Sequence, residues 1–304
     1  MCKIPRNDEA IIEENLIQVL GEGHNQWNYR EDLKSEEDLW QNLRRKITQN
    51  NLSEIGENPI TDKEFDSIKI ELLLHTKTPF HAAKWLKGEN GIARITIDRE
   101  EVTLGSMSLI LYSNQDIGGG ISTYEVVNQI AKRKSDIDDR ERRFDVTLLI
   151  NGLPIVQIEL KQAGAKDGYY QAFNQIKKYA EEGMFRNNIF STLQLFVISN
   201  EHTTRYFANA LPKNMDRKFL FSWRTTDNRK VENIYEFVKQ VLNIPDAHRL
   251  IAHYTIVSED NDNKVLMVLH PYQIHAIEAL FTSAMKHKSG FIWHATGSGK
   301  TLTS

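Results

Sequence analysis

The stretch that most constrains this chain is 141–161, where two alternating apolar runs flank the dipeptide Asn151-Gly152. Asn-Gly between such runs is a strong signal for a tight β-hairpin turn. The apolar positions are Val146, Leu148 and Ile150 in the first run and Val156, Ile158 and Leu160 in the second. Because side chains alternate between the two faces of a strand, each strand has one apolar face and one face that carries polar groups.

The turn decides how the two strands pair. A two-residue loop at Asn151-Gly152 would place Asp145 opposite Ile158 and set apolar beside polar side chains on both faces. A three-residue loop with Gly152 in the left-handed region shifts the pairing by one residue and places Asp145 opposite Gln157. Because a one-residue slip moves every side chain to the other face, we predict the second register. In that register Asp145 shares a face with Glu159 and Lys161.

Two carboxylates and an ammonium group on one face predict a metal site. Paired carboxylates raise each other's pKa unless a cation lies between them. Mg²⁺ binds a few carboxylates and keeps water at its other positions, and a nearby lysine can orient a metal-activated water or stabilise charge on a phosphate. We therefore predict that Asp145, Glu159 and Lys161 are catalytic, with Asp145 and Glu159 as Mg²⁺ ligands. The alternative for these three residues alone is a solvated sheet face with a surface ion pair.

The spacing of these residues resembles a nuclease motif. Asp145, thirteen residues and then Glu159-x-Lys161 is similar to the pattern of the PD-(D/E)xK nuclease superfamily. Gln175 and Tyr179, four apart on a predicted helix, resemble the Gln-x-x-x-Tyr arrangement of RecB-like nucleases. That resemblance implies an α/β fold with a mixed sheet flanked by helices, and it implies that Gln175 and Tyr179 contact DNA.

Other charged residues near the hairpin have two interpretations. A basic cluster precedes Asp145 and consists of Lys132, Arg133, Lys134, Arg140, Arg142 and Arg143. It is either a solvated loop or a contact for the DNA backbone, with Arg142 and Arg143 as the candidates closest to Asp145. Nucleases of this superfamily often carry a further acid on an earlier helix, and Glu36 or Glu37 could supply it. We favour the simpler explanation that a helix N-terminus attracts acids.

Composition limits the class of protein. The chain has 304 residues, 40% apolar and 26% charged, with a formal net charge of −3. These values describe a globular protein with room for one large or two ordinary domains, in which any DNA-binding surface must be a local patch. No apolar run is long enough for a membrane span, and the N-terminus resembles neither a signal nor a transit peptide. The single cysteine, Cys2, excludes an internal disulfide and fits the cytoplasm.

The hydrophobic pattern predicts several further elements. Helices are expected at 8–20, 35–51, 61–74, 168–182 and 231–242, the second capped by Ser35 with Asp38. Strands are expected at 94–97, 106–112, 124–130, 193–199 and 253–257, and 193–199 reads as fully buried. A polar, acidic stretch at 258–264 marks the expected domain boundary. We therefore predict an endonuclease domain over 1–258, with its core at about 90–200, and a second domain over 259–304.

The second domain begins with a predicted phosphate-binding loop. An apolar strand at 291–293 leads into a glycine-rich turn that ends in Gly299-Lys300-Thr301. Backbone N–H groups of such a loop cradle phosphates, its lysine reaches the β/γ-phosphates and its threonine holds Mg²⁺. The predicted nucleotide-binding residues are Thr296, Gly297, Ser298, Gly299, Lys300 and Thr301. His294 stands where the general pattern has glycine, a departure common in the superfamily 2 helicases that this motif resembles.

Gln273 completes the predicted nucleotide site. Pro271-Tyr272-Gln273 resembles the Q motif of those helicases, in which the glutamine amide pairs with adenine. Its alternative is a solvent-facing glutamine on a helix. The resemblance implies the start of a RecA-like motor domain that uses ATP with Mg²⁺. Because no downstream Asp-Glu motif and no second lobe are present, we expect negligible ATPase activity from this chain.

Together these motifs resemble the restriction subunit of Type I restriction–modification enzymes. The likeness runs through TYEVVNQI, RRFDVTLLINGLPIVQIELK, AFNQIKKY, LQLFVISN, TRYFAN, LHPYQIHAIEA and FIWHATGSGKTLTS. It implies an ATP-dependent, site-specific endonuclease that cuts double-stranded DNA after translocation and assembles with modification and specificity subunits. The alternatives are a standalone nuclease-helicase of DNA repair and a non-catalytic DNA-binding or assembly module.

Overall fold

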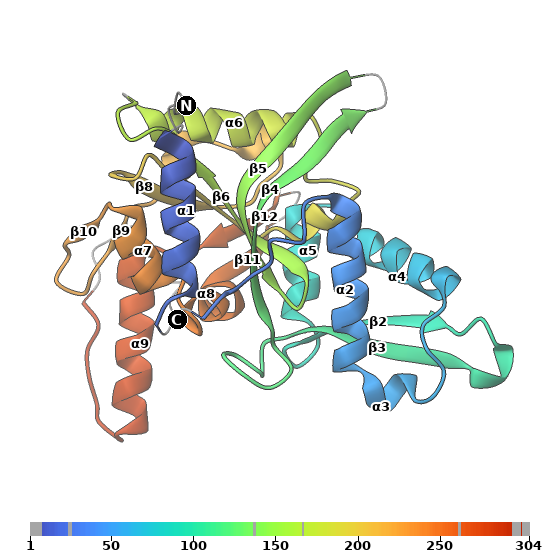
Figure 1. Cartoon of the computed structure of the whole chain (residues 1–304). Coiled ribbons are helices and arrows are strands. Elements are labelled where there is room, and N and C mark those ends of the chain that lie inside the picture. The colour runs from blue at the N-terminus through green and yellow to red at the C-terminus, as the bar shows by residue number, and fades with distance from the viewer. Residues whose placement is uncertain are drawn as a thin grey trace.

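The structure, a computed structural model, describes residues 8–23, 26–135, 138–165, 167–260, 263–293 and 299. At its centre is a six-stranded mixed sheet with the order β1-β4-β5-β6-β7-β8 (Figure 1). The strands are β1 (Asn28–Tyr29), β4 (Tyr124–Ser135), β5 (Asp138–Ile150), β6 (Leu153–Leu160), β7 (Leu195–Ser199) and β8 (Thr204–Ala208). β1 is parallel to β4 and β6 is parallel to β7, whereas the other neighbours are antiparallel. The predicted mixed sheet is therefore confirmed.

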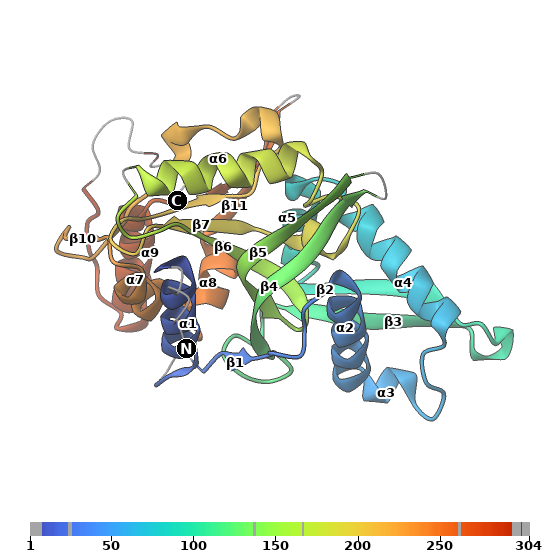
Figure 2. The same cartoon turned by 45° about the horizontal axis from the view of Figure 1, so that its top comes forward.

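Helices cover both faces of this sheet. Figure 2 shows α6 (Gly168–Glu181) on one side and α1 (Asp8–Gly21) on the other. Phe144 of β5 packs on Tyr179 of α6, with ring centroids 5.5 Å apart, and Phe207 of β8 packs on Phe173 of the same helix. α1 also packs against α7 (Ile234–Val241), and Trp27 after α1 donates a 2.7 Å hydrogen bond to the carbonyl of Leu242. The N-terminal segment is thus held by residues that come much later in the chain.

A smaller lobe lies beside the sheet and is built largely from residues 36–113 (Figure 1). It contains α2 (Glu36–Asn50), α3 (Leu52–Ile55), α4 (Asp62–His75), α5 (Pro79–Lys87), η1 (Val102–Leu104) and the antiparallel ribbon of β2 (Ile92–Asp98) and β3 (Ser106–Ser113). The predicted cap of α2 is confirmed, because Ser35 and Asp38 form a capping box. Thr61 and Glu64 cap α4 in the same way.

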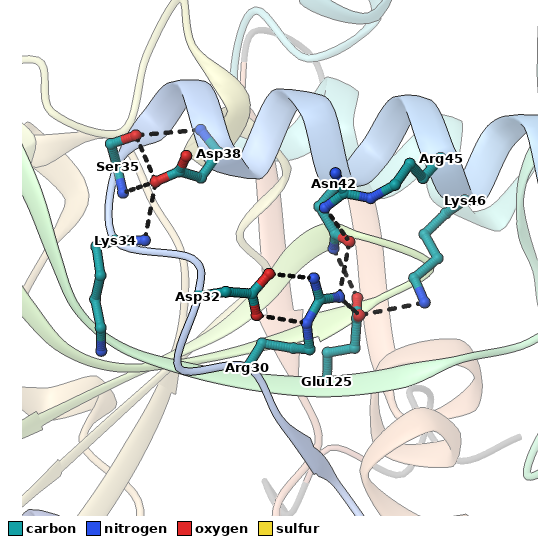
Figure 3. Close-up of polar contacts among 9 residues, drawn as sticks. All are labelled: Arg30, Asp32, Lys34, Ser35, Asp38, Asn42, Arg45, Lys46 and Glu125. Carbon is teal, nitrogen blue, oxygen red and sulfur yellow. Dashed lines mark hydrogen bonds and ion pairs between the residues drawn. The ribbon is translucent and has the colours of Figure 1, made fainter.

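A buried glutamate ties α2 and β1 to the sheet. Glu125 of β4 is 1% exposed and is contacted by Arg30, Lys46 and Asn42 (Figure 3). Lys46 lies 3.2 Å from the carboxylate and Asn42 donates at 2.7 Å. Arg30 also donates two hydrogen bonds to Asp32, and these contacts raise its pKa above the ordinary value. Because a buried charge is costly unless it is paired and hydrogen-bonded, this set of contacts stabilises the junction between β1, α2 and β4.

The register of the β5–β6 hairpin differs from the predicted one. Asn151 and Gly152 both have positive φ, +53° and +80°, and they form a two-residue turn between Ile150 and Leu153. Ile155 is then an extra residue, a β-bulge, so that Thr147 rather than Asp145 lies opposite Gln157. The left-handed Gly152 is confirmed, but the shift that keeps apolar residues opposite apolar ones comes from the bulge and not from a longer turn.

The polar face of the hairpin is buried. All residues of β6 are buried, and Thr147, Gln157 and Glu159 are 0% exposed. The alternative of a solvated sheet face with a surface ion pair is therefore wrong. The single-sequence pattern could not show this, because burial of that face depends on elements outside the hairpin. Gln157 lies in one lateral row with Phe196 and Phe207, and Phe207 packs on Phe173 of α6.

The segment after the sheet forms a second group of elements. It contains β9 (Trp223–Arg224), β10 (Lys230–Val231), α7, α8 (Asp246–His253), β11 (Thr255–Asp260), β12 (Asn263–Val268) and α9 (Pro271–Met285). The helix expected at 231–242 begins only at Ile234, because Asn233 caps it and Val231 pairs in β10. Residues 258–264, where we placed the domain boundary, fall within the antiparallel β11–β12 hairpin, and the boundary itself stays a prediction.

The strand expected at 291–293 is not formed. Within the residues described, Phe291 to Trp293 have no strand partner, and Phe291 and Trp293 are 101% and 97% exposed. A lone strand leaves its backbone groups unpaired, which explains why this apolar run is not assigned as one. Across the described ranges, no helix is long and apolar enough to cross a membrane.

Candidate active site

The three predicted catalytic residues meet at the ends of β5 and β6. Val146 pairs with Ile158, which places Asp145 beside Glu159 on the neighbouring strand. The Asp145 carboxylate accepts a 2.7 Å hydrogen bond from the backbone N–H of Leu160. The Lys161 ammonium lies 3.6 Å from Glu159 Oε1 and donates at 2.8 Å to the carbonyl of Leu160. The predicted convergence of these side chains is therefore present in the structure, although the predicted register is not.

Glu159 is a buried acid whose carboxylate, within the described part of the chain, lacks hydrogen-bond donors. It is 0% exposed, and neither carboxylate oxygen has a hydrogen-bond partner among the residues described. The 3.6 Å separation from Lys161 is an ion pair but exceeds normal hydrogen-bond length. Burial raises the pKa of Glu159 well above its ordinary value, the Asp145 carboxylate raises it further, and Lys161 opposes both. Burying a carboxylate without hydrogen-bond donors is costly, which favours a further cation beside Glu159.

Asp145 is a second buried acid with a raised pKa. Burial raises its pKa to about 7, against the opposing effects of the Leu160 N–H and of Lys161. Two acids with raised pKa values beside one ammonium group are typical of a functional site rather than of a structural ion pair. Bound Mg²⁺ would favour the ionised form of both carboxylates.

Two further acids face this pair from α1. Glu9 and Glu13 lie four residues apart, and the charge of each raises the pKa of Asp145. Glu13 is 8% exposed, and burial raises its own pKa. Its two carboxylate oxygens accept hydrogen bonds from Asn128 (2.5 Å) and Gln129 (2.6 Å) of β4. Neither acid is among the residues predicted from the sequence; their spacing on the first predicted helix was the signal that could have found them.

The earlier candidates on α2 lie elsewhere. Glu36 accepts a 3.4 Å hydrogen bond from Trp40, and Glu37 accepts a 2.7 Å hydrogen bond from Gln41, within their own helix. Neither is among the main charges that act on Asp145. The simpler explanation of these two acids, as residues favoured at a helix N-terminus, agrees with this arrangement.

A left-handed residue of β4 lies directly opposite Asp145. Asn128 pairs with Val146 and Ile130 pairs with Phe144, which leaves Gln129, with φ of +53°, across from Asp145. A left-handed residue that is not glycine is strained, and such strain often occurs at functional sites. The Gln129 amide at this position donates to Glu13.

The donor set suits a hard cation with few protein ligands. In the part of the chain that the structure describes, no group of three or more His, Cys, Asp or Glu side chains could hold a metal ion together. Asp145 and Glu159 would therefore supply two carboxylates and leave the remaining positions to water, as Mg²⁺ often requires. The two unsatisfied oxygens of Glu159 fit that role.

The predicted DNA-binding residues have different surroundings. Gln175 and Tyr179 share a face of α6, where the Gln175 amide donates at 2.7 Å to the Tyr179 hydroxyl. The Tyr179 ring is only 5% exposed and packs against Phe144, whereas Gln175 is partly exposed. Arg143 is exposed, and Arg142 pairs through its backbone with Lys132 in the β4–β5 ribbon. DNA contact by these four residues stays a prediction.

Of the predicted nucleotide-binding residues, Gln273 and Gly299 are described. Gln273 is 1% exposed, accepts a 2.9 Å hydrogen bond from the N–H of His270 and donates at 3.2 Å to the carbonyl of Gly299. The alternative of a solvent-facing glutamine is therefore wrong. Thr296, Gly297, Ser298, Lys300 and Thr301 lie outside the described residues.

Comparison with protein-family models identifies the class of this chain. Residues 7–215 match the Type I restriction enzyme R protein N terminus, and residues 266–304 match the Type III restriction enzyme res subunit. The first match covers most of the chain, so the chain belongs to the family of Type I restriction enzyme R proteins. The predicted family resemblance is confirmed.

Individual relatives agree with this assignment. The chain is 32% identical over 276 residues to the Type I restriction enzyme SauMSSORF170P endonuclease subunit of Staphylococcus aureus, a match that covers 90% of this chain and 27% of that protein. It is 35% identical over 174 residues to the Type I restriction enzyme EcoprrI endonuclease subunit of Escherichia coli, covering 54% of each. The chain thus spans about a quarter of the length of the staphylococcal relative.

Proposed function

We propose that this chain carries the Mg²⁺-dependent DNA endonuclease site of a Type I restriction subunit, on a core of the PD-(D/E)xK type. The observation that carries the proposal is the pair of buried Glu159 oxygens without hydrogen-bond donors, beside Asp145 and within ion-pair distance of Lys161. The family membership of the chain supports a restriction endonuclease.

Each residue has a distinct role in this proposal. Asp145 and Glu159 would hold Mg²⁺, which supplies a water of lowered pKa as the nucleophile for the phosphodiester. The Leu160 N–H fixes the Asp145 carboxylate toward Glu159. Lys161 would stabilise negative charge on the phosphate or position the water, since its ammonium group lies 3.6 Å from Glu159 Oε1.

Cleavage assays with this chain test the catalytic assignment. Asp145→Ala, Glu159→Ala and Lys161→Ala are each expected to reduce DNA cleavage at least about 100-fold, the scale of a lost catalytic group. Glu37→Gln is the matched control, because Glu37 is an exposed acid outside the site, and it should retain wild-type cleavage. Persistent cleavage by Asp145→Ala would contradict the proposal.

Metal binding gives a second test that does not depend on activity. Mg²⁺ should raise the unfolding temperature of the wild type and leave that of Glu159→Gln unchanged, because the variant lacks the ligand. In EDTA, Glu159→Gln should unfold at or above the wild-type temperature, since it removes a buried carboxylate whose oxygens have no hydrogen-bond donor among the described residues. An equal Mg²⁺ shift in both proteins would favour the alternative of a non-catalytic assembly module.

The activity of the whole subunit extends this proposal beyond the present chain. We infer that an ATP-driven motor follows the nuclease site, that the substrate is double-stranded DNA in the cytoplasm, and that modification and specificity subunits complete the complex. The contact between Gln273 and Gly299 supports a nucleotide site at the start of that motor. Co-purification with the two other subunits distinguishes this assembly from a standalone repair nuclease-helicase.

A further inference from the structure

Two arginines and two tyrosines contact one another at the start of α6. The rings of Tyr169 and Tyr170 lie 4.2 Å apart between centroids. The guanidinium of Arg205, from β8, lies 5.2 Å from the Tyr169 ring, and that of Arg217, from η4 (Arg217–Phe219), lies 4.7 Å from the Tyr170 ring. We call these four residues the arginine–tyrosine ladder. Its members come from three separate segments, so the fold and not local sequence assembles it.

The ladder lies close to the acid site. Gly168 begins α6, and a Cβ at that position would lie 3.4 Å from the Cβ of Lys161, so the first turn of α6 packs directly on Lys161. Arg205 belongs to the same lateral row of the sheet as Glu159, because Glu159 pairs with Ile198 and Ile198 pairs with Arg205. Two strand spacings separate Glu159 and Arg205 at the backbone, about 10 Å.

Beyond Tyr170 the ladder continues into a charged surface along α6. Asn174 accepts a 3.3 Å hydrogen bond from Arg217, and the Lys177 ammonium lies 3.5 Å from the carbonyl of Met215. We define the basic ridge as Tyr170, Asn174 and Lys177 of α6 together with Arg217 and Lys218 of η4. Asp216 lies 3.5 Å from Lys218 and offsets one of the three positive charges. The ridge therefore keeps a positive excess in a chain whose net charge is −3.

Arg217 is the best-placed cation on the ridge. It is exposed, and it has no ion-pair partner among the residues that the structure describes. Its guanidinium is held by the Tyr170 ring and the Asn174 amide, which fixes a planar group with donors still available. Arginine held in this way is suited to phosphate, which it can bind through two parallel hydrogen bonds.

We propose that the basic ridge binds the phosphate backbone of duplex DNA beside the acid site. The proposal rests on the nuclease function and adds the surface that guides the substrate to it. Each ladder ring already contacts the other ring and a guanidinium, so the ridge offers charge rather than a free ring for base stacking. Contacts to phosphates fix the position of a protein on DNA without reading the base sequence.

Binding of this chain to a short labelled duplex in EDTA tests the proposal without cleavage. Arg217→Ala is expected to weaken binding several-fold at low salt, and Lys177→Ala with Arg217→Ala to weaken it at least about tenfold. The slope of log K against log salt should fall by roughly 0.9 for each phosphate that the variant no longer neutralises. Arg94→Ala is the matched control, because Arg94 is an exposed arginine on β2, far from α6, and should bind as the wild type does.

The binding measurements either support or overturn DNA binding by the basic ridge. Loss of affinity and slope in the ridge variants, with the Arg94 variant unaffected, supports the ridge. Wild-type affinity and slope in the double variant, or no duplex binding by the wild-type chain at low salt, overturns it. The nuclease proposal is judged separately, by cleavage and Mg²⁺ binding of the Asp145 and Glu159 variants, which should still bind DNA in EDTA.

Discussion

At the scale of single residues, His248 shows how burial sets the charge of a side chain outside the acid site. Its ring is 0% exposed, and its Nδ1 lies 2.8 Å from the hydroxyl of Tyr124. That hydroxyl accepts a hydrogen bond from the N–H of Gly118, so its own proton is free to be donated to His248. Burial, together with the charge of nearby His253, lowers the pKa of His248 to about 4. The imidazole is therefore neutral in the folded chain at pH 7.

This pKa predicts a loss of stability in acid. Between pH 6.5 and about 4 the unfolded chain binds a proton at His248 and the folded chain does not. Stability should therefore fall as the pH falls through this window, by up to about 3 kcal/mol. Urea unfolding of His248→Asn across this range should show a shallower pH dependence than the wild type. His202→Gln, at an exposed histidine, should not change it; equal slopes for wild type and His248→Asn would contradict the prediction.

The acid site shows what sequence can establish at this scale. Alternation along two strands was enough to predict that Asp145, Glu159 and Lys161 share a face, and their side chains do converge. It could not show that the face is buried, or that Glu9 and Glu13 lie close enough to raise the pKa of Asp145, because both follow from the packing of helices outside the hairpin. The pKa values of Asp145 and Glu159 depend on every element that packs against them.

At the scale of elements, the turn of the β5–β6 hairpin depends on Gly152. Its φ of +80° is rarely adopted by other residues, and a Cβ there would lie 3.0 Å from the backbone of Leu43 in α2. Gly152→Ala should therefore destabilise the chain by about 1–3 kcal/mol through strain and the close contact. Gly164→Ala is the control, since its φ is ordinary and no atom lies within 4 Å of its Cβ position.

The midpoint of urea unfolding measures this effect. Gly152→Ala should shift the midpoint to lower urea at an unchanged slope, and Gly164→Ala should stay within about 0.5 kcal/mol of the wild type. Equal midpoints for the two variants would show that α2 moves away from the turn at little cost.

Elements with strong local signals were predicted well. Ser35, with the apolar stripe of α2 behind it, places the start of that helix correctly. The bulge at Ile155 was missed because nothing in the local pattern separates it from a longer turn; both devices keep apolar residues opposite one another. The helix α5 was also missed, although Thr78-Pro79 before it and Gly88 after it are ordinary boundary signals.

At the scale of the whole molecule, the sheet depends on elements far along the chain. Ile234, Phe237 and Val238 of α7 are 0% exposed and belong to the same core as the sheet. The parallel pairs β1–β4 and β6–β7 likewise join distant segments. Such pairings could not be predicted from one sequence, because no local turn specifies them.

A truncation tests this dependence. A chain of residues 1–215, the segment that matches the N-terminal family model, lacks α7 and α8 and should not unfold cooperatively in urea. A chain of residues 1–285 keeps both helices and α9 and should unfold as the full chain does. A cooperative transition for 1–215 at the full-length midpoint would show that the sheet is stable without them.

The hydrogen bond from Trp27 to Leu242 spans 215 residues, which gives it a consequence during synthesis. At roughly 5–20 residues per second, a ribosome needs on the order of 10–40 s to cover that distance. Until then α7 does not exist, and α1, which carries Glu9 and Glu13, lacks the helix it packs against. A growing chain can therefore finish its acid site only after most of this segment has been translated, so that prematurely released chains carry Asp145 and Glu159 without Glu9 and Glu13 held in place beside them.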